Sequence, residues 1–126
     1  MKTIEFRLAI DGLIFLIMIL SGIWLSRKGK PYHKGIVALH KITALLAVVY
    51  TAILISHMLN GIQIPSVVWI AIIVTGILFI LNLVSGALLT IEKPMPVSVL
   101  FIHRYTPILL IVLCLAALYM TIKLVA

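Results

Sequence analysis

Four long runs of apolar residues alternate with short polar breaks along this chain. The runs cover about residues 8–26, 36–58, 66–90 and 98–122, and the breaks cover 27–35, 60–65 and 92–96. Each run meets the requirement of about 20 residues for a helix that crosses a hydrocarbon core about 30 Å thick. Short breaks make sequential helices antiparallel neighbours. We therefore predict an all-α fold in which residues 1–126 form a single up-down-up-down bundle of four transmembrane helices.

Composition supports a lipid environment. Hydrophobic residues make up 64% of the 126 residues and charged residues 10%, whereas soluble domains have about 45–50% and about 25%. The net charge of +7 does not indicate a nucleic-acid partner, because the basic residues lie between the apolar runs. The single cysteine, Cys114, excludes an internal disulfide and the CxxCH attachment site of c-type haem.

The basic residues also predict the orientation of the helices. Three lie on the side of the termini, whereas seven lie on the side of the first and third breaks: Arg27, Lys28, Lys30, Lys34, Lys41, Lys93 and Arg104. Cytoplasmic loops carry an excess of Lys and Arg. We therefore expect both termini outside and those two breaks in the cytoplasm, in a bacterial or archaeal plasma membrane.

The second half of the chain repeats the first. GLIFLIMILSG at 12–22 is matched by GILFILNLVSG at 76–86, and HKITALL at 40–46 is matched by HRYTPIL at 103–109. Matched His, Gly, Ser and basic positions are not expected from apolar composition alone. The repeat units cover about 8–58 and 66–124, and each contains two helices. Parallel repeats of this kind are related by an axis along the membrane normal, which predicts His40 and His103 at one depth on diagonally opposed helices.

Histidine inside a membrane helix is costly and suggests a functional site. Packed helices lie about 8–10 Å apart, so a diagonal pair in a square bundle is separated by roughly 12–14 Å. That distance is too long for two imidazoles to share a bare ion, but it fits a haem with one imidazole on each face. We predict His40 and His103 as the ligands of the haem iron.

The neighbours of the two histidines fit the same prediction. Gly22 and Gly86 lie at the matching depth of their helices, where small residues would let a macrocycle approach the backbone. Lys41 and Arg104 directly follow the histidines and could bind the haem propionates. The alternatives are close helix packing at the glycines and snorkelling of the two cations toward the interface.

This arrangement of histidines on the second and fourth helices and glycines on the first and third resembles the membrane-embedded b-type cytochromes. That group includes the haem-carrying anchor subunits of hydrogenases and formate dehydrogenases and the small quinone-linked cytochromes b. The resemblance implies non-covalent haem b with bis-histidine ligation, and one-electron transfer between a quinone and a redox partner subunit. It favours an electron-transfer protein or subunit over a stand-alone enzyme. The chain departs from the two-haem members, which carry four ligand histidines.

Two other ionisable residues bear on alternative functions and on the number of haem groups. Asp11 shares a helix face with Phe15, Met18 and Gly22 by helical spacing, so it would point toward the bundle interior if Gly22 does, where it could handle protons or a quinone hydroxyl. We favour its interpretation as an interfacial or helix-start charge beside Arg7. Small multidrug-type proton-coupled transporters, which act as dimers, also carry a carboxylate in their first helix. A non-haem structural subunit is the third possibility. His57 lies 17 residues after His40, so the two side chains point about 100° apart around the helix. His57 is therefore not expected to be a ligand, which predicts one haem per chain.

Overall fold

The structure is a computed structural model that describes the backbone of residues 2–125 and the side chains of residues 3–124. The side chain of Lys2, one of the three basic residues counted on the outer side, lies outside the described part.

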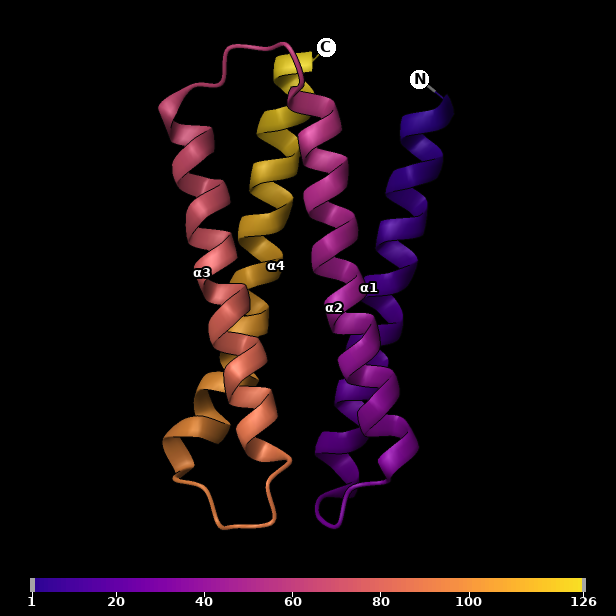
Figure 1. The fold of residues 1–126 in the computed structure, drawn as a ribbon, viewed down its shortest axis with the longest axis vertical. Helices are drawn as coiled ribbons and strands as arrows, with labels where there is room; N and C mark the ends of the chain where they lie inside the picture. The colour runs from indigo at the N-terminus through magenta and orange to yellow at the C-terminus, as the bar shows by residue number, and fades with distance from the viewer. Residues whose placement is uncertain (1, 126) are drawn as a thin grey trace. The chain divides into compact units, whose positions relative to one another are not determined.

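Residues 2–125 form four α-helices, in the order α1 (Lys2–Lys28), α2 (Lys34–Leu59), α3 (Ser66–Leu89) and α4 (Val97–Val125) (Figure 1). Among residues 2–125 there is no strand. The predicted all-α fold of four long helices connected in up-and-down order is confirmed. All four helices are long and apolar enough to cross a membrane, and the chain is an integral membrane protein.

Most helix boundaries agree with the apolar runs, and the main difference is at α1. This helix begins at Lys2, six residues before the predicted start at 8. The prediction followed the apolar run, whereas the helix continues through the mixed polar and apolar residues before it. Gly29, with φ of +69°, follows the end of α1, and its N–H donates to the Leu25 carbonyl at 3.1 Å. A left-handed glycine directly after the last turn is a common helix C-terminus.

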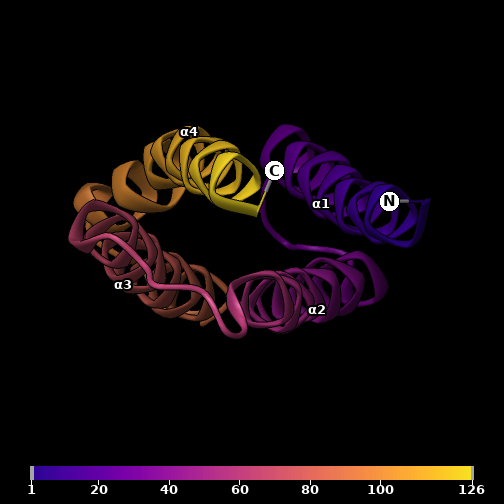
Figure 2. The same cartoon turned by 90° about the horizontal axis from the view of Figure 1, so that it is seen from above.

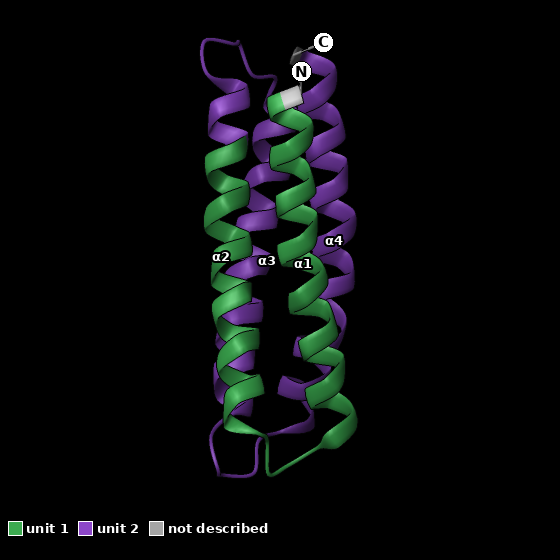
Figure 3. Ribbon diagram, turned by 90° about the vertical axis from the view of Figure 1, so that its right-hand side faces the viewer, with its two compact units in different colours: residues 1–54 green, residues 55–126 purple. Residues whose placement is uncertain are grey.

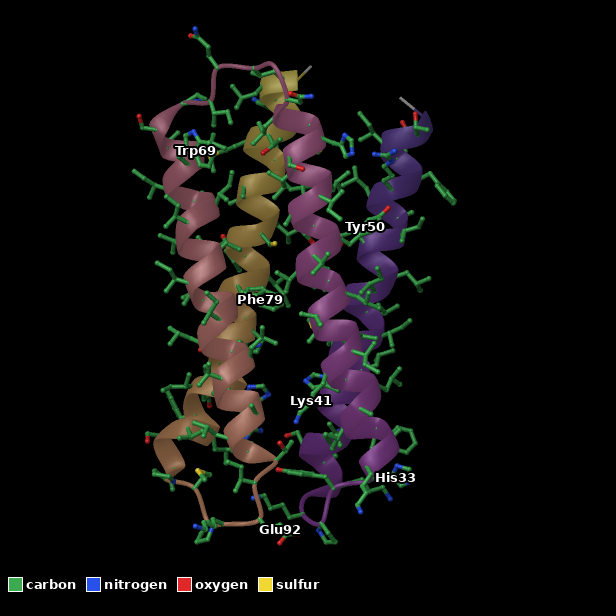
Figure 4. The ribbon with its side chains drawn as sticks, viewed as in Figure 1. His33, Lys41, Tyr50, Trp69, Phe79 and Glu92 are labelled. Carbon is green, nitrogen blue, oxygen red and sulfur yellow. The ribbon has the colours of Figure 1, made fainter. Side chains whose placement is uncertain are left out.

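A histidine caps the start of α2. His33 precedes α2, and its Nδ1 accepts a hydrogen bond from the Ile36 N–H at 3.4 Å. This contact satisfies a first-turn N–H group that has no partner within the helix. The His33 carbonyl accepts the first backbone hydrogen bond of the helix, from the Val37 N–H at 3.0 Å. Figure 4 shows His33 at this end of α2, with Lys41 further along the same helix.

The chain divides into two compact units, residues 1–54 and residues 55–126, which are described separately here (Figure 3). The division falls within α2, about one turn before its end, and not in the loop between the predicted repeats. Within the first unit α1 and α2 lie side by side and antiparallel, and within the second α3 and α4 do the same (Figures 1 and 2).

Large apolar side chains cover the outside of the helices. Leu13, Ile42, Ile70 and Leu115 are all more than half exposed, with Leu115 at 65%. A soluble protein rarely exposes contiguous apolar surface of this kind, whereas lipid tails solvate it. The outer faces therefore contact the bilayer.

Candidate functional site

His40 on α2 is fixed against α1 by its Nδ1 atom. Nδ1 lies 2.9 Å from the Met18 carbonyl oxygen and 3.1 Å from the Ser21 hydroxyl. The Ser21 hydroxyl in turn donates to the same Met18 carbonyl at 2.9 Å. Ser21 is buried and His40 is half-buried. The imidazole is thus held by one turn of the neighbouring helix.

His103 on α4 repeats this arrangement against α3. Its Nδ1 lies 3.1 Å from the Asn82 carbonyl oxygen and 3.1 Å from the Ser85 hydroxyl. The Ser85 hydroxyl donates to the Asn82 carbonyl, also at 3.1 Å. The internal repeat seen in the sequence is therefore a repeat of hydrogen bonds as well.

These contacts fix the tautomer of both histidines. A carbonyl oxygen can only accept a hydrogen bond, so Nδ1 must carry the ring proton and donate it. In the neutral imidazole the lone pair then lies on Nε2. Histidines that bind a metal almost always donate their other ring N–H to a carbonyl or carboxylate, which sets the ring orientation and raises its basicity. His40 and His103 each have this arrangement.

The two glycines make room for the imidazoles. A Cβ added at Gly22 would lie 2.8 Å from His40 Cε1, and one added at Gly86 would lie 2.7 Å from His103 Cε1. Real Cβ atoms essentially never approach a neighbour this closely. The sequence suggested that these glycines admit a macrocycle. The contact that the structure shows at both positions is with the Cε1 atom of a histidine ring.

The remaining polar residues of α2 and α4 have other positions and contacts. Lys41 and Arg104 follow their histidines and are exposed on the helix surface. The Thr43 hydroxyl donates to the Leu39 carbonyl at 2.8 Å and to the His40 carbonyl at 3.1 Å, as threonines in helices commonly do. His57 is exposed near the end of α2.

Asn82 occupies the position that matches Met18 in the other repeat. Its backbone carbonyl, and not its side chain, accepts from His103. The side-chain Oδ1 is buried and has no hydrogen-bond partner among the described residues. The amide is therefore a polar group beside His103 that the first unit lacks.

Asp11 is buried, with an exposed fraction of 6%, and the Thr51 hydroxyl of α2 lies 3.0 Å from Oδ1 and 3.1 Å from Oδ2. Helical spacing had left this orientation open, because Asp11 lies on one stripe of α1 with Met18 and Ser21, which are also buried. The structure supports the inward orientation and not the favoured interpretation of Asp11 as an interfacial charge.

No group of three or more His, Cys, Asp or Glu side chains that could hold a metal ion occurs in the part of the chain that the structure describes. No protein-family model matches the sequence, and comparisons with characterised proteins and with solved structures gave no match.

Proposed function

We propose that the chain is a transmembrane b-type cytochrome that binds one haem b, with His40 and His103 as the axial ligands. One observation carries the proposal: each repeat holds one imidazole in the same way, with its Nδ1 proton on a carbonyl of the neighbouring helix. This fixes Nε2 as the nitrogen that bears the lone pair. Because the porphyrin supplies the equatorial ligands of the iron, the protein needs to supply only two axial imidazoles.

The residues of each unit have distinct roles in this proposal. The carbonyls of Met18 and Asn82 hold the ring protons and increase the basicity of the imidazoles. The glycines allow each ring to lie close to the neighbouring helix, and the serines restrict its rotation. Lys41 and Arg104 would offer positive charge to the haem propionates.

Haem supplies reversible one-electron chemistry, and two imidazole ligands leave no iron position for oxygen. We propose that the protein relays electrons between a quinone and a redox partner subunit. A partner or mobile carrier is needed because the loops of residues 29–33, 60–65 and 90–96 are too short to hold another redox centre.

The absorption spectrum of the purified full-length protein tests this proposal. We expect a low-spin reduced-minus-oxidised spectrum that His40→Ala and His103→Ala each abolish. His33→Asn is the matched control, because asparagine keeps an N-terminal cap on α2 and should leave the spectrum unchanged. A colourless wild-type protein from haem-supplied cells, or a normal spectrum in both single variants, would refute the assignment. A transporter or a structural subunit would be colourless.

A further inference from the structure

A second polar site lies in the first unit, away from His40. Asp11 and Thr51 are 6% and 7% exposed, and they join α1 to α2 through the Thr51 hydroxyl. Asp11 lies ten residues before Ser21, which corresponds to about 15 Å along the helix axis. The Asp11–Thr51 pair is therefore separate from the His40 contacts, and the proposed electron transfer does not use it.

No positive charge is paired with Asp11. Thr51 is the only hydrogen-bonding or ion-pairing partner of its side chain among the described residues. The other titratable groups near this level of the two helices are Glu5 and Arg7, both exposed on α1, and on α2 the half-buried Tyr50 and the exposed His57. Tyr50 precedes Thr51 and so points about 100° away from it around the helix. None of these groups forms an ion pair with Asp11.

An ionised carboxylate in such a place is unfavourable. Burying an unpaired charge is so costly that it is normally neutralised, and a single neutral hydroxyl cannot replace a counter-ion. Neutralisation requires either a proton or a bound cation. A metal cation prefers several oxygen ligands, whereas among residues 3–124 Thr51 supplies the only hydrogen-bonding oxygen to the carboxyl group. A proton needs only the carboxyl group itself.

We infer that Asp11 and Thr51 form a reversible proton-binding site between α1 and α2. The site takes up one proton as the carboxylate becomes the carboxylic acid and releases it in the reverse step, with no other bond changed. Thr51 positions the carboxyl group and hydrogen-bonds to it. Because this inference depends only on the first unit, it holds whether or not the chain binds haem.

The other repeat lacks this site. The positions that match Asp11 and Thr51 are Thr75 and Cys114, and the Thr75 hydroxyl donates to the Ala71 carbonyl of its own helix at 2.7 Å. No carboxyl group takes part there. The second unit therefore provides an internal control for helix pairs without a proton site.

The sequence allows a direct test, because Asp11 is the only aspartate in the chain. Full-length protein in lipid nanodiscs, with aspartate labelled by ¹³C at Cγ, should give a single carboxyl resonance in the NMR spectrum. We expect that resonance to move between two limits as the pH is changed, and to disappear in Asp11→Asn prepared with the same label. Thr51→Val should shift its position, whereas Thr75→Val should not.

Three results would overturn the inference. The first is a resonance that stays at the ionised-carboxylate position at every pH at which the protein is folded. The second is a resonance fixed at the acid position, because the proton would then be structural and not exchangeable. The third is a resonance that responds to added sodium at constant pH, which would indicate a cation site. The labelled wild-type protein gives each answer even if the variants fail to fold.

Discussion

Adding one methyl group at Gly22 or Gly86 should displace a histidine and weaken haem binding. An alanine Cβ at Gly22 would lie 2.8 Å from His40 Cε1, whereas carbon atoms prefer separations of about 3.5–4.0 Å. The ring must therefore move by about 1 Å. The bond from Nδ1 to the Met18 carbonyl, now 2.9 Å, would then exceed the range of a good hydrogen bond.

The size of the effect follows from two contributions. Overpacking of a filled site typically costs about 1–3 kcal/mol, and loss of a hydrogen bond costs about 0.5–1.5 kcal/mol. Together these amount to about 1.5–4.5 kcal/mol, or a loss of roughly 10- to 1,600-fold in haem affinity where the whole cost falls on binding, at about 1.4 kcal/mol per factor of ten. Gly86→Ala should behave alike, because its Cβ would lie 2.7 Å from His103 Cε1.

The chain offers matched controls on the same two helices. Gly12 and Gly76 are also equivalent in the repeat, and a Cβ at either would meet nothing within 4 Å. Gly12→Ala and Gly76→Ala should keep the wild-type haem content, and they should slightly stabilise their helices. The assay is haem titration of each purified variant, followed by its reduced-minus-oxidised spectrum, with thermal unfolding of the haem-free protein as an independent readout. Equal haem affinity and equal unfolding temperature in all four variants would show that the glycines do not position the imidazoles.

Three further predictions address the serines, the topology and the stoichiometry. Ser21→Ala and Ser85→Ala should each weaken haem binding by about 1 kcal/mol while the spectrum stays low-spin; a change to a high-spin spectrum would mean that the serines do more than restrict the ring. Cysteines introduced at Lys28 and Gln63, in a background without the native cysteine, should react from the cytoplasmic and outer sides respectively, and the opposite labelling of intact cells would reverse the predicted orientation. The ratio of haem to protein should be one in both wild type and His57→Ala, and a ratio near two that falls to one in the variant would reveal a second site.

Much of the fold follows from the sequence, because lipid permits few alternatives. A backbone surrounded by hydrocarbon must satisfy its own hydrogen bonds, so each long apolar run becomes a helix. The ends were less predictable, because α1 continues through polar residues to Lys2. The cap at His33 was also missed, since histidine is not one of the residues that usually cap helices.

The sequence singled out the main residues of the candidate site but not all of the contacts between them. The repeat identified His40, His103, Gly22 and Gly86, yet it could not show that each glycine faces an imidazole. That contact depends on the rotation of one helix against its neighbour, which is set by packing of the whole interface. The burial of Asp11 stayed an alternative for a related reason, because helical spacing places Asp11 on the face of Gly22 but does not show which way that face turns.

Some positions carry the same residue in both repeats and others do not, and this difference separates two functions. The serine, glycine and histidine recur in both units and make the same contacts, so both units position an imidazole. By contrast, Asp11 is matched by a threonine and Thr51 by Cys114. A duplication that retained its imidazole contacts while differing at the carboxyl site would give two matching haem ligands but only one proton site. The proposed haem should therefore respond alike to changes in either unit, whereas proton binding should respond only to changes in the first.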